Sequence, residues 1–109
     1  MLFTAENRWW MQETGERFPR NRPPDETHPL FVLRRIQGMS TTICPCTSKP
    51  LTAARAIRQG CVFQDTGRIL KKKTYLLEQF SLSLPEQMRF ASWPQYLGQV
   101  PSTCLEAGS

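Results

Sequence analysis

The sequence predicts a mainly β fold: a small, curled antiparallel sheet with one or two short helices near the C-terminal end. The 109 residues suit a single domain, residues 1–109. Apolar residues form short clusters, and the longest uninterrupted apolar run, residues 30–33, has four members. A membrane-spanning helix needs about 20 such residues, so none is expected. Nine prolines disfavour a helical bundle, and eleven aromatic residues disfavour a disordered chain.

The N-terminal part is expected to hold one strand and one long loop. Residues 6–12 predict a first strand, in which Trp9 or Trp10 faces the core. Residues 13–29 are polar and contain four prolines and three arginines, a composition typical of a loop. A loop of this length in a small domain is usually functional or mobile.

A hairpin follows and is the clearest feature of the sequence. Residues 30–36 form an apolar run after a proline, as in a buried strand. Gln37 and Gly38 indicate the turn, and the β-branched residues within 39–46 predict the return strand. Pro45 is expected at a sheet edge or in a bulge, because proline donates no hydrogen bond to a neighbouring strand.

The second half predicts shorter elements. Residues 53–59 are compatible with either a helix or a strand, and residues 74–80 predict a strand. Around them we expect a loop over 47–52, a short strand over 61–63 and a turn over 65–67.

Short helices are expected near the C-terminal end. Ser83 and the glutamate three residues later fit a capping box, in which both side chains satisfy free backbone donors at a helix start. The helix would span residues 84–91. A further turn over 92–96 would close at Gly98, and residues 99–109 are expected to form a loose tail.

The charge distribution indicates a polyanionic partner, nucleic acid first. The net charge is +5, but residues 1–73 hold 13 basic and 6 acidic side chains, a net charge of +7. Residues 74–109 hold 1 basic and 3 acidic side chains, a net charge of −2. Arginine predominates, and its fork of donors suits phosphate and carboxylate groups. The alternative is an ordinary solvated basic face.

The four cysteines are expected to be buried, unreactive thiols. Residues 1–10 lack the basic start and long apolar stretch of a secretory signal, so a cytoplasmic, reducing location is expected. A disulfide framework is therefore not expected. Cys44 and Cys46 are two residues apart, whereas zinc sites usually space their first pair more widely and require a second pair. We expect no metal and no other cofactor.

Three segments together resemble the MazF/PemK-like toxins. The first, residues 28–33 (His-Pro-Leu-Phe-Val-Leu), is similar to the family's Arg-Pro-apolar-Val-Leu strand. The second, residues 43–49 (Ile-Cys-Pro-Cys-Thr-Ser-Lys), is similar to the strand that ends in Pro-x-Thr-Ser. The third, residues 75–80, resembles the apolar strand with Asp-Gln that precedes the late helices. The resemblance implies an SH3-like barrel, a ribosome-independent endoribonuclease, a homodimer and an antitoxin with an acidic segment.

The resemblance also implies where the site lies. The family's usual site residues are an Arg at the Arg-Pro step and a Thr at the strand end. Thr47 matches the Thr, but His28 stands in place of the Arg. In one interpretation His28 is the catalytic acid or base, because its ordinary pKa of about 6.5 suits proton transfer near neutrality. In the other, catalysis has been lost and His28 is an ordinary loop residue.

Further polar side chains are candidates for substrate binding. Arg20 and Arg22 would supply the positive charge that the missing Arg leaves out, and the Thr47 hydroxyl would donate to a phosphate oxygen. The remaining candidates are Ser48, Lys49, Lys71, Lys72 and Lys73, of which the three consecutive lysines equally suit a solvated turn.

Two other sets of side chains have both a structural and a functional interpretation. Trp9 and Trp10 would pack in the core or at the surface, or one of them would stack on a base. Arg34 and Arg35 would point to opposite faces of their strand, and one of them would meet an acidic partner such as Glu78.

The leading functional hypothesis, which the resemblance implies, is a metal-independent endoribonuclease that cleaves single-stranded RNA and leaves a cyclic phosphate. The alternative is a non-catalytic barrel that binds nucleic acid or an acidic protein segment. His28 in place of Arg favours this alternative.

Overall fold

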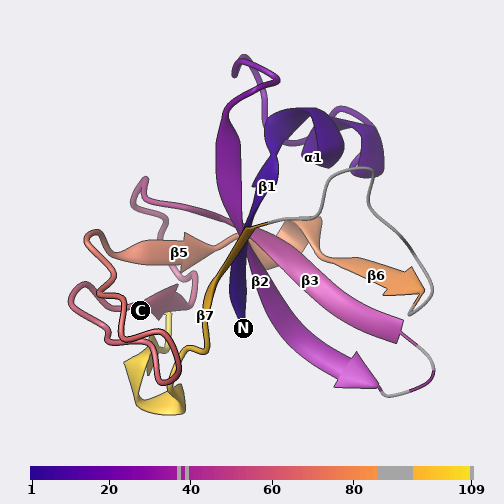
Figure 1. Ribbon diagram of the computed structural model, residues 1–109. Helices are drawn as coiled ribbons and strands as arrows, with labels where there is room; N and C mark the ends of the chain where they lie inside the picture. Colours follow the sequence, from indigo (N-terminus) through magenta and orange to yellow (C-terminus); the bar gives the residue numbers. More distant parts are fainter. Residues whose placement is uncertain (37, 39, 86–94, 109) are drawn as a thin grey trace.

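The computed structural model describes residues 1–36, 38, 40–85 and 95–108, and these form a curled antiparallel sheet with one short α-helix (Figure 1). The sheet order is β7-β1-β2-β3-β5-β4-β8, and β6 pairs with β3 beside this path. Its strands are β1 (Leu2–Glu6), β2 (Thr27–Ile36), β3 (Ser40–Thr47), β4 (Ala56–Ile57), β5 (Thr74–Leu76), β6 (Leu82–Pro85), β7 (Gln95–Gly98) and β8 (Leu105–Glu106). The helical elements are α1 (Asn7–Glu13) and the 3-10 turns η1 (Glu78–Phe80) and η2 (Ser102–Cys104). The sheet is a half-barrel consistent with a small SH3-like barrel, and the predicted mainly β fold class is confirmed.

Strand β3 is the centre of the sheet. One edge pairs with β2, in the predicted hairpin. The other edge changes partner along its length: Ser40–Ile43 pair with β6, and Cys46 and Thr47 pair with β5. The turn of the hairpin includes Gly38 at φ +78°, a conformation that glycine adopts without strain. Gln37 and Met39, also assigned to the hairpin, lie outside the described residues.

Pro45 lies in this central strand and not at the predicted edge or bulge. It is fully buried opposite Leu30 of β2, and its carbonyl accepts a hydrogen bond from the Leu77 N–H at 2.9 Å. The position tolerates proline because it lies where β3 passes from one partner to the next. The bulge of the hairpin is in β2, between Val32 and Arg34.

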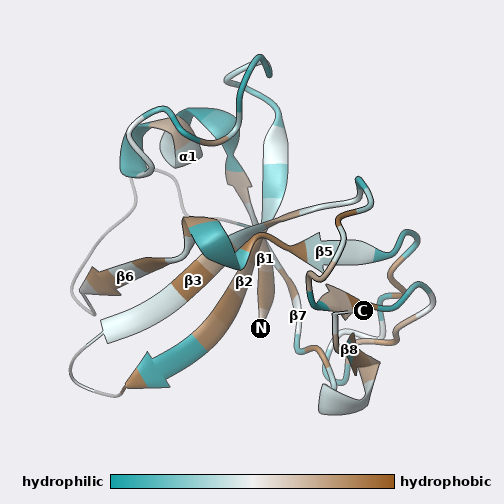
Figure 2. Ribbon diagram, turned by 180° about the vertical axis from the view of Figure 1, so that it is seen from behind, coloured by the Kyte–Doolittle hydropathy of each residue, from teal (hydrophilic) through white to brown (hydrophobic). Residues whose placement is uncertain are grey.

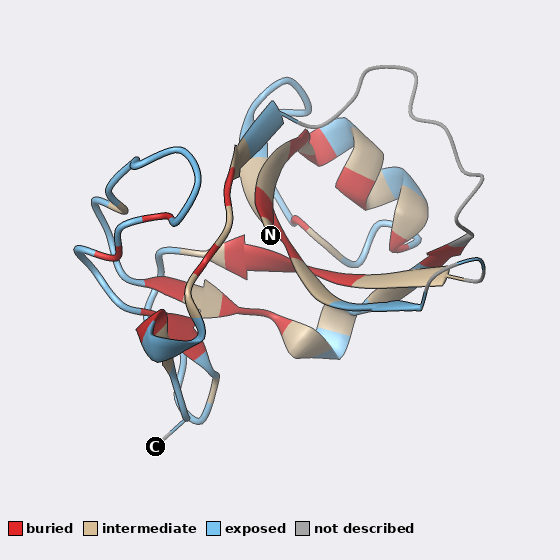
Figure 3. Ribbon diagram, turned by 60° about the horizontal axis from the view of Figure 1, so that its bottom comes forward, coloured by how far each residue is buried: buried red, intermediate tan, exposed pale blue. Residues whose placement is uncertain are grey.

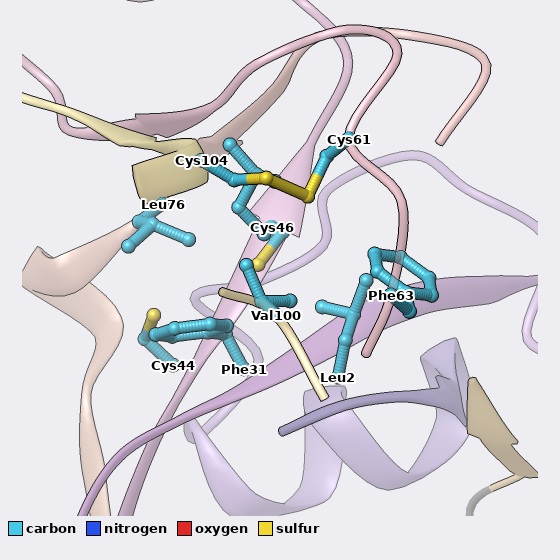
Figure 4. Packing of buried hydrophobic residues seen from close by; sticks show 10 residues of the cluster. Leu2, Phe31, Cys44, Cys46, Cys61, Phe63, Leu76, Val100 and Cys104 are labelled. Atoms are coloured by element: carbon cyan, nitrogen blue, oxygen red, sulfur yellow. A yellow bond between two sulfur atoms is a disulfide. The ribbon is translucent and has the colours of Figure 1, made fainter. Parts of the chain in front are cut away.

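Two hydrophobic clusters stabilise the sheet. The first, cluster 1, contains Leu2, Phe31, Cys44, Cys46, Ile57, Cys61, Phe63, Leu76, Val100 and Cys104 (Figure 4). The second, cluster 2, contains Ala5, Trp10, Leu30, Ile43 and Leu84, and thus joins α1 to β2, β3 and β6. Figure 3 shows the buried residues along the central strands and the exposed loops beyond them.

Residues 6–12 are not the predicted strand, because the chain turns into α1 after Glu6. The buried residues here are Asn7, Trp10 and Thr14, whose spacing of three and four is that of a helix face. Two of the three are polar, so the helical period is absent from the pattern of apolar residues alone. Trp10 is the tryptophan that enters the core.

The predicted strand over residues 74–80 is only partly present. Strand β5 ends at Leu76, and η1 follows directly after Leu77. Of the shorter predictions, the turn over 65–67 is confirmed, and residues 61–63 contribute a single bridge between Val62 and Ile69. The ambiguous segment 53–59 contains the two-residue strand β4.

The predicted late helices are wrong wherever the structure describes them. Ser83 and Leu84 belong to β6, where the Ser83 hydroxyl lies 3.3 Å from the Thr42 hydroxyl and caps no helix. Tyr96 and Gly98 belong to β7, which pairs with β1. The rest of both predictions, residues 86–94, lies outside the described residues.

The expected loose tail is also wrong up to residue 106. Val100 and Cys104 are buried in cluster 1, and β8 pairs with β4. Cys104 forms a disulfide with Cys61. Spacing alone could not indicate this bond, because it joins segments 43 residues apart.

Candidate functional site

His28 lies near the start of β2, where its ring is held by neighbours from two other segments. Its Nδ1 is 2.5 Å from Oδ1 of Asn7, the first residue of α1. The Phe18 ring packs edge-on against the imidazole, with 5.0 Å between the ring centroids. The side chain is half-buried and belongs to β2, so His28 is not the ordinary loop residue of the second interpretation.

Asn7 connects the start of α1 to His28 and to the end of loop 14–26. It is completely buried, and all of its polar side-chain atoms have partners. Its Nδ2 donates to the Pro23 carbonyl at 2.9 Å, and its backbone N–H donates to the Glu26 carbonyl at 2.8 Å. The end of loop 14–26 is therefore tied to the start of α1, next to His28.

The environment favours the neutral form of His28. Its pKa lies below the ordinary value of 6.5, first because burial disfavours the charged ring and then because the Arg22 guanidinium repels the imidazolium. Glu26 acts in the opposite direction with a smaller effect. Arg20 and Arg22 are exposed on loop 14–26, the hydrophilic segment above α1 in Figure 2. The charge of Arg22 thus acts against protonation of His28.

Thr47 ends β3 in a different setting. It pairs with Tyr75 of β5, so the two side chains share the face of the sheet opposite that of the buried pair Cys46–Leu76. Its hydroxyl accepts a hydrogen bond from the Lys49 N–H at 3.1 Å, which leaves the hydroxyl proton available. Ser48 and Lys49 are exposed in the turn that follows.

The three consecutive lysines lie beside the Thr47 end of the sheet. Lys71, Lys72 and Lys73 are exposed and lead directly into β5. The Lys73 Nζ is 5.3 Å from the centre of the Tyr75 ring and 3.8 Å from the Glu106 carboxylate. Part of the positive charge of this segment is therefore balanced within the protein.

The predicted site residues fall into two groups. The first, the His28 group, comprises His28, Arg20 and Arg22; the second, the Thr47 group, comprises Thr47, Ser48, Lys49, Lys71, Lys72 and Lys73. The pairing of β2 with β3 ends at Leu30 and Pro45. Beyond that point the start of β2 pairs with β1, the end of β3 pairs with β5, and the two strands separate (Figure 1).

Several secondary predictions are corrected. Glu78 does not bind Arg34 or Arg35: both are exposed, and Glu78 forms a two-pronged ion pair with Arg55 at 2.6 and 3.0 Å. Among the described residues, no three His, Cys, Asp or Glu side chains are arranged to hold a metal ion.

The cysteines divide into two pairs. Cys44 and Cys46 are free and buried, as predicted, and burial raises the pKa of Cys46 well above its ordinary value. Cys61 and Cys104 form a disulfide, contrary to the expectation of four thiols. That expectation depended on a reducing location and not on any feature of these two positions.

Asn7 is the site residue that sequence reasoning missed. A polar residue within a segment interpreted as a strand gave no reason to connect it with His28, 21 residues away. The spacing of Asn7, Trp10 and Thr14 was the available signal, and it becomes visible only once burial is known.

None of the helices formed by the described residues is long and apolar enough to cross a membrane. No family model, no curated protein sequence and no solved structure matches the chain.

Proposed function

We propose that the protein is a metal-independent endoribonuclease that cleaves single-stranded RNA, as its resemblance to the MazF/PemK-like toxins implies. The observation that carries the proposal is the setting of His28: a half-buried imidazole, favoured in its neutral form, within the field of Arg22. A neutral imidazole near pH 7 can accept a proton, and the guanidinium of Arg22, whose charge acts on the ring, suits a phosphate.

The reaction is a transesterification within the RNA. The 2′-oxygen forms a bond to the neighbouring phosphorus while the bond from phosphorus to the 5′-oxygen breaks. His28 takes the 2′-hydroxyl proton through the ring nitrogen that is not bonded to Asn7, and the 5′-oxygen gains a proton from the imidazolium or from water. Arg22 and Arg20 stabilise the charge of the pentavalent phosphorus centre. The products are a 2′,3′-cyclic phosphate and a 5′-hydroxyl.

The Thr47 group binds the same RNA strand at nucleotides next to the cleaved bond. The Thr47 hydroxyl and the turn that contains Ser48 and Lys49 donate to phosphate oxygens. The exposed lysines 71–73 follow the backbone away from the site, as electrostatic contacts to a single strand do. A single strand, whose backbone bends freely, suits two groups on separating strands better than a duplex does.

A second candidate function is binding without cleavage, to nucleic acid or to an acidic protein segment. The separation of the His28 group from the Thr47 group favours it, because binding does not require the two groups to meet at one phosphate. Neutralising Lys71, Lys72 and Lys73 together would then flatten the salt dependence of RNA binding by about 2–3 units, and an unchanged slope would exclude these lysines from the contact.

The deciding experiment incubates the purified protein with mixed-sequence single-stranded RNA in EDTA and maps the product ends. We expect discrete cuts that leave cyclic phosphates. His28→Ala should slow cleavage by about 10²-fold or more with the fold intact. Thr47→Ala should weaken RNA binding, because it removes a phosphate contact at a neighbouring nucleotide. Thr52→Ala, a nearby exposed threonine, is the matched control and should cleave normally. Intact RNA at high protein concentration would reject the nuclease and leave the binding function.

The proposal also includes a cytoplasmic homodimer that an acidic antitoxin segment inhibits, and the basic charge of residues 1–73 supports such a partner. The Cys61–Cys104 disulfide weighs against a cytoplasmic location, because disulfides persist mainly in oxidising compartments. Light scattering in solution tests the dimer: a monomeric mass across micromolar concentrations would reject it.

A further inference from the structure

We propose that Asn7 is a positioning residue for His28, which determines the ring nitrogen that carries the proton and holds the Arg22 loop beside the ring. The catalytic part of this inference rests on the proposed ribonuclease function, whereas the effect on the imidazole itself does not.

The hydrogen bonds of Asn7 determine the direction of its amide. Its Nδ2 donates to the Pro23 carbonyl, which only accepts hydrogen bonds. The amide oxygen therefore faces His28, and this oxygen also only accepts. His28 must donate through Nδ1–H, and Nε2 keeps the lone pair. A ring in this tautomer is ready to take a proton at Nε2.

Because position 7 is buried, it requires a side chain with both a donor and an acceptor. Asn7 is completely buried, and a buried amide is costly unless its donor and acceptor both have partners. The Pro23 carbonyl and the imidazole provide one partner each. A side chain without both a donor and an acceptor would leave one of these groups unpaired. The position thus favours asparagine over apolar residues of similar size.

Asn7 also links the ring to the arginines. Its backbone N–H and its Nδ2 hold the carbonyls of Glu26 and Pro23, which end the loop that carries Arg20 and Arg22. The charged groups that face His28 are Arg22, which disfavours the imidazolium, and Glu26, which favours it. Asn7 adds an acceptor without adding charge, so the ring keeps its proton on Nδ1 and remains neutral.

Nuclear magnetic resonance tests the inference directly, because His28 is the only histidine in the chain. Nitrogen-15 shifts of the wild-type imidazole at pH 8 should show the proton on Nδ1. Asn7→Asp should raise the pKa of His28 by about one unit, because a carboxylate favours the imidazolium. Asn7→Ala should give a mixture of both tautomers. Gln12→Ala, on the exposed side of α1, is the control and should leave both quantities unchanged.

Two results would overturn the inference. One is a wild-type ring with its proton on Nε2, a measurement that needs no variant. The other is a folded Asn7→Ala protein whose tautomer and pKa equal those of the wild type. If the wild type cleaves RNA, Asn7→Asp should also move the acidic limb of the pH–rate profile upward with the pKa of His28. Absence of cleavage would reject the ribonuclease but leave the tautomer result standing.

Discussion

Reduction of the Cys61–Cys104 disulfide should lower the free energy of unfolding by about 4 kcal/mol. The bond joins the segment after β4 to the segment before β8, and both cysteines are buried in cluster 1. Reduction removes no buried side-chain atom, so its main effect is on the unfolded chain. Without the bond, the unfolded chain gains conformational freedom, and the folded state becomes relatively less stable.

The magnitude follows from the length of the closed loop. A sequence separation of 43 residues restricts the entropy of the unfolded chain by about 13 cal/mol/K, which is about 4 kcal/mol at 25 °C. Domains of this size are usually stable by about 5–15 kcal/mol in total. Loss of the bond should therefore remove a large part of the stability.

Urea unfolding of the oxidised and the reduced protein measures this difference. The Cys61→Ala/Cys104→Ala variant should lose at least as much stability as reduction removes, and its stability should not respond to a reducing agent. Thiol titration of the denatured, oxidised protein should find two thiols, from Cys44 and Cys46. In the folded protein these two should react slowly, because both are buried.

A difference below about 1 kcal/mol between the oxidised and reduced proteins would refute the argument from loop length. Four thiols in the denatured protein, without any reducing agent, would show that the bond does not form at all. Only the second result would restore the expectation of four free thiols.

Three further predictions concern packing and charge. Gly98→Ala should destabilise the fold by about 1–3 kcal/mol, measured by thermal unfolding, because the new Cβ would lie 2.7 Å from the Phe63 side chain. Ile57→Ala, in cluster 1, should cost about 2–5 kcal/mol in urea unfolding, and a smaller loss would indicate that the core closes around the gap. The half-exposed Arg55–Glu78 pair should contribute about 0.5 kcal/mol in a double-mutant cycle. The hydrogen bond from Arg55 lowers the pKa of Glu78, so this contribution is present above the ordinary value of 4.5 and lost as the pH falls through the lowered one. A contribution that does not change with pH would contradict the pairing.

The central hairpin could be predicted from the sequence because its signals are local. An apolar run, a turn with glycine and a β-branched return strand all point to the same structure. The helix α1 could not be predicted in this way, because the face that it buries includes Asn7 and Thr14. Their polar atoms find partners only in the folded chain.

The predictions for the C-terminal part were wrong for a different reason. The apparent capping box at Ser83 is a valid local signal, but pairing of β6 with β3 buries Leu84 and outweighs it. Residues 99–106 are likewise ordered by long-range interactions, namely the pairing of β8 with β4 and the Cys61–Cys104 disulfide. The candidate site shows the same division. His28 is proposed through the resemblance and Arg22 by its charge, whereas the role of Asn7 depends on tertiary structure.

The pairing of β1 with β7 affects how the protein is made. Leu2 lies opposite Gly98 and is completely buried in the same cluster as Val100. Strand β1 is synthesised before β7, so it cannot be fully covered until β7 has also been made. A nascent chain, or a fragment cut off before β7, exposes Leu2 and the apolar surface around it, and such exposed surface promotes aggregation. Synthesis of β7 is thus a precondition for closing the core.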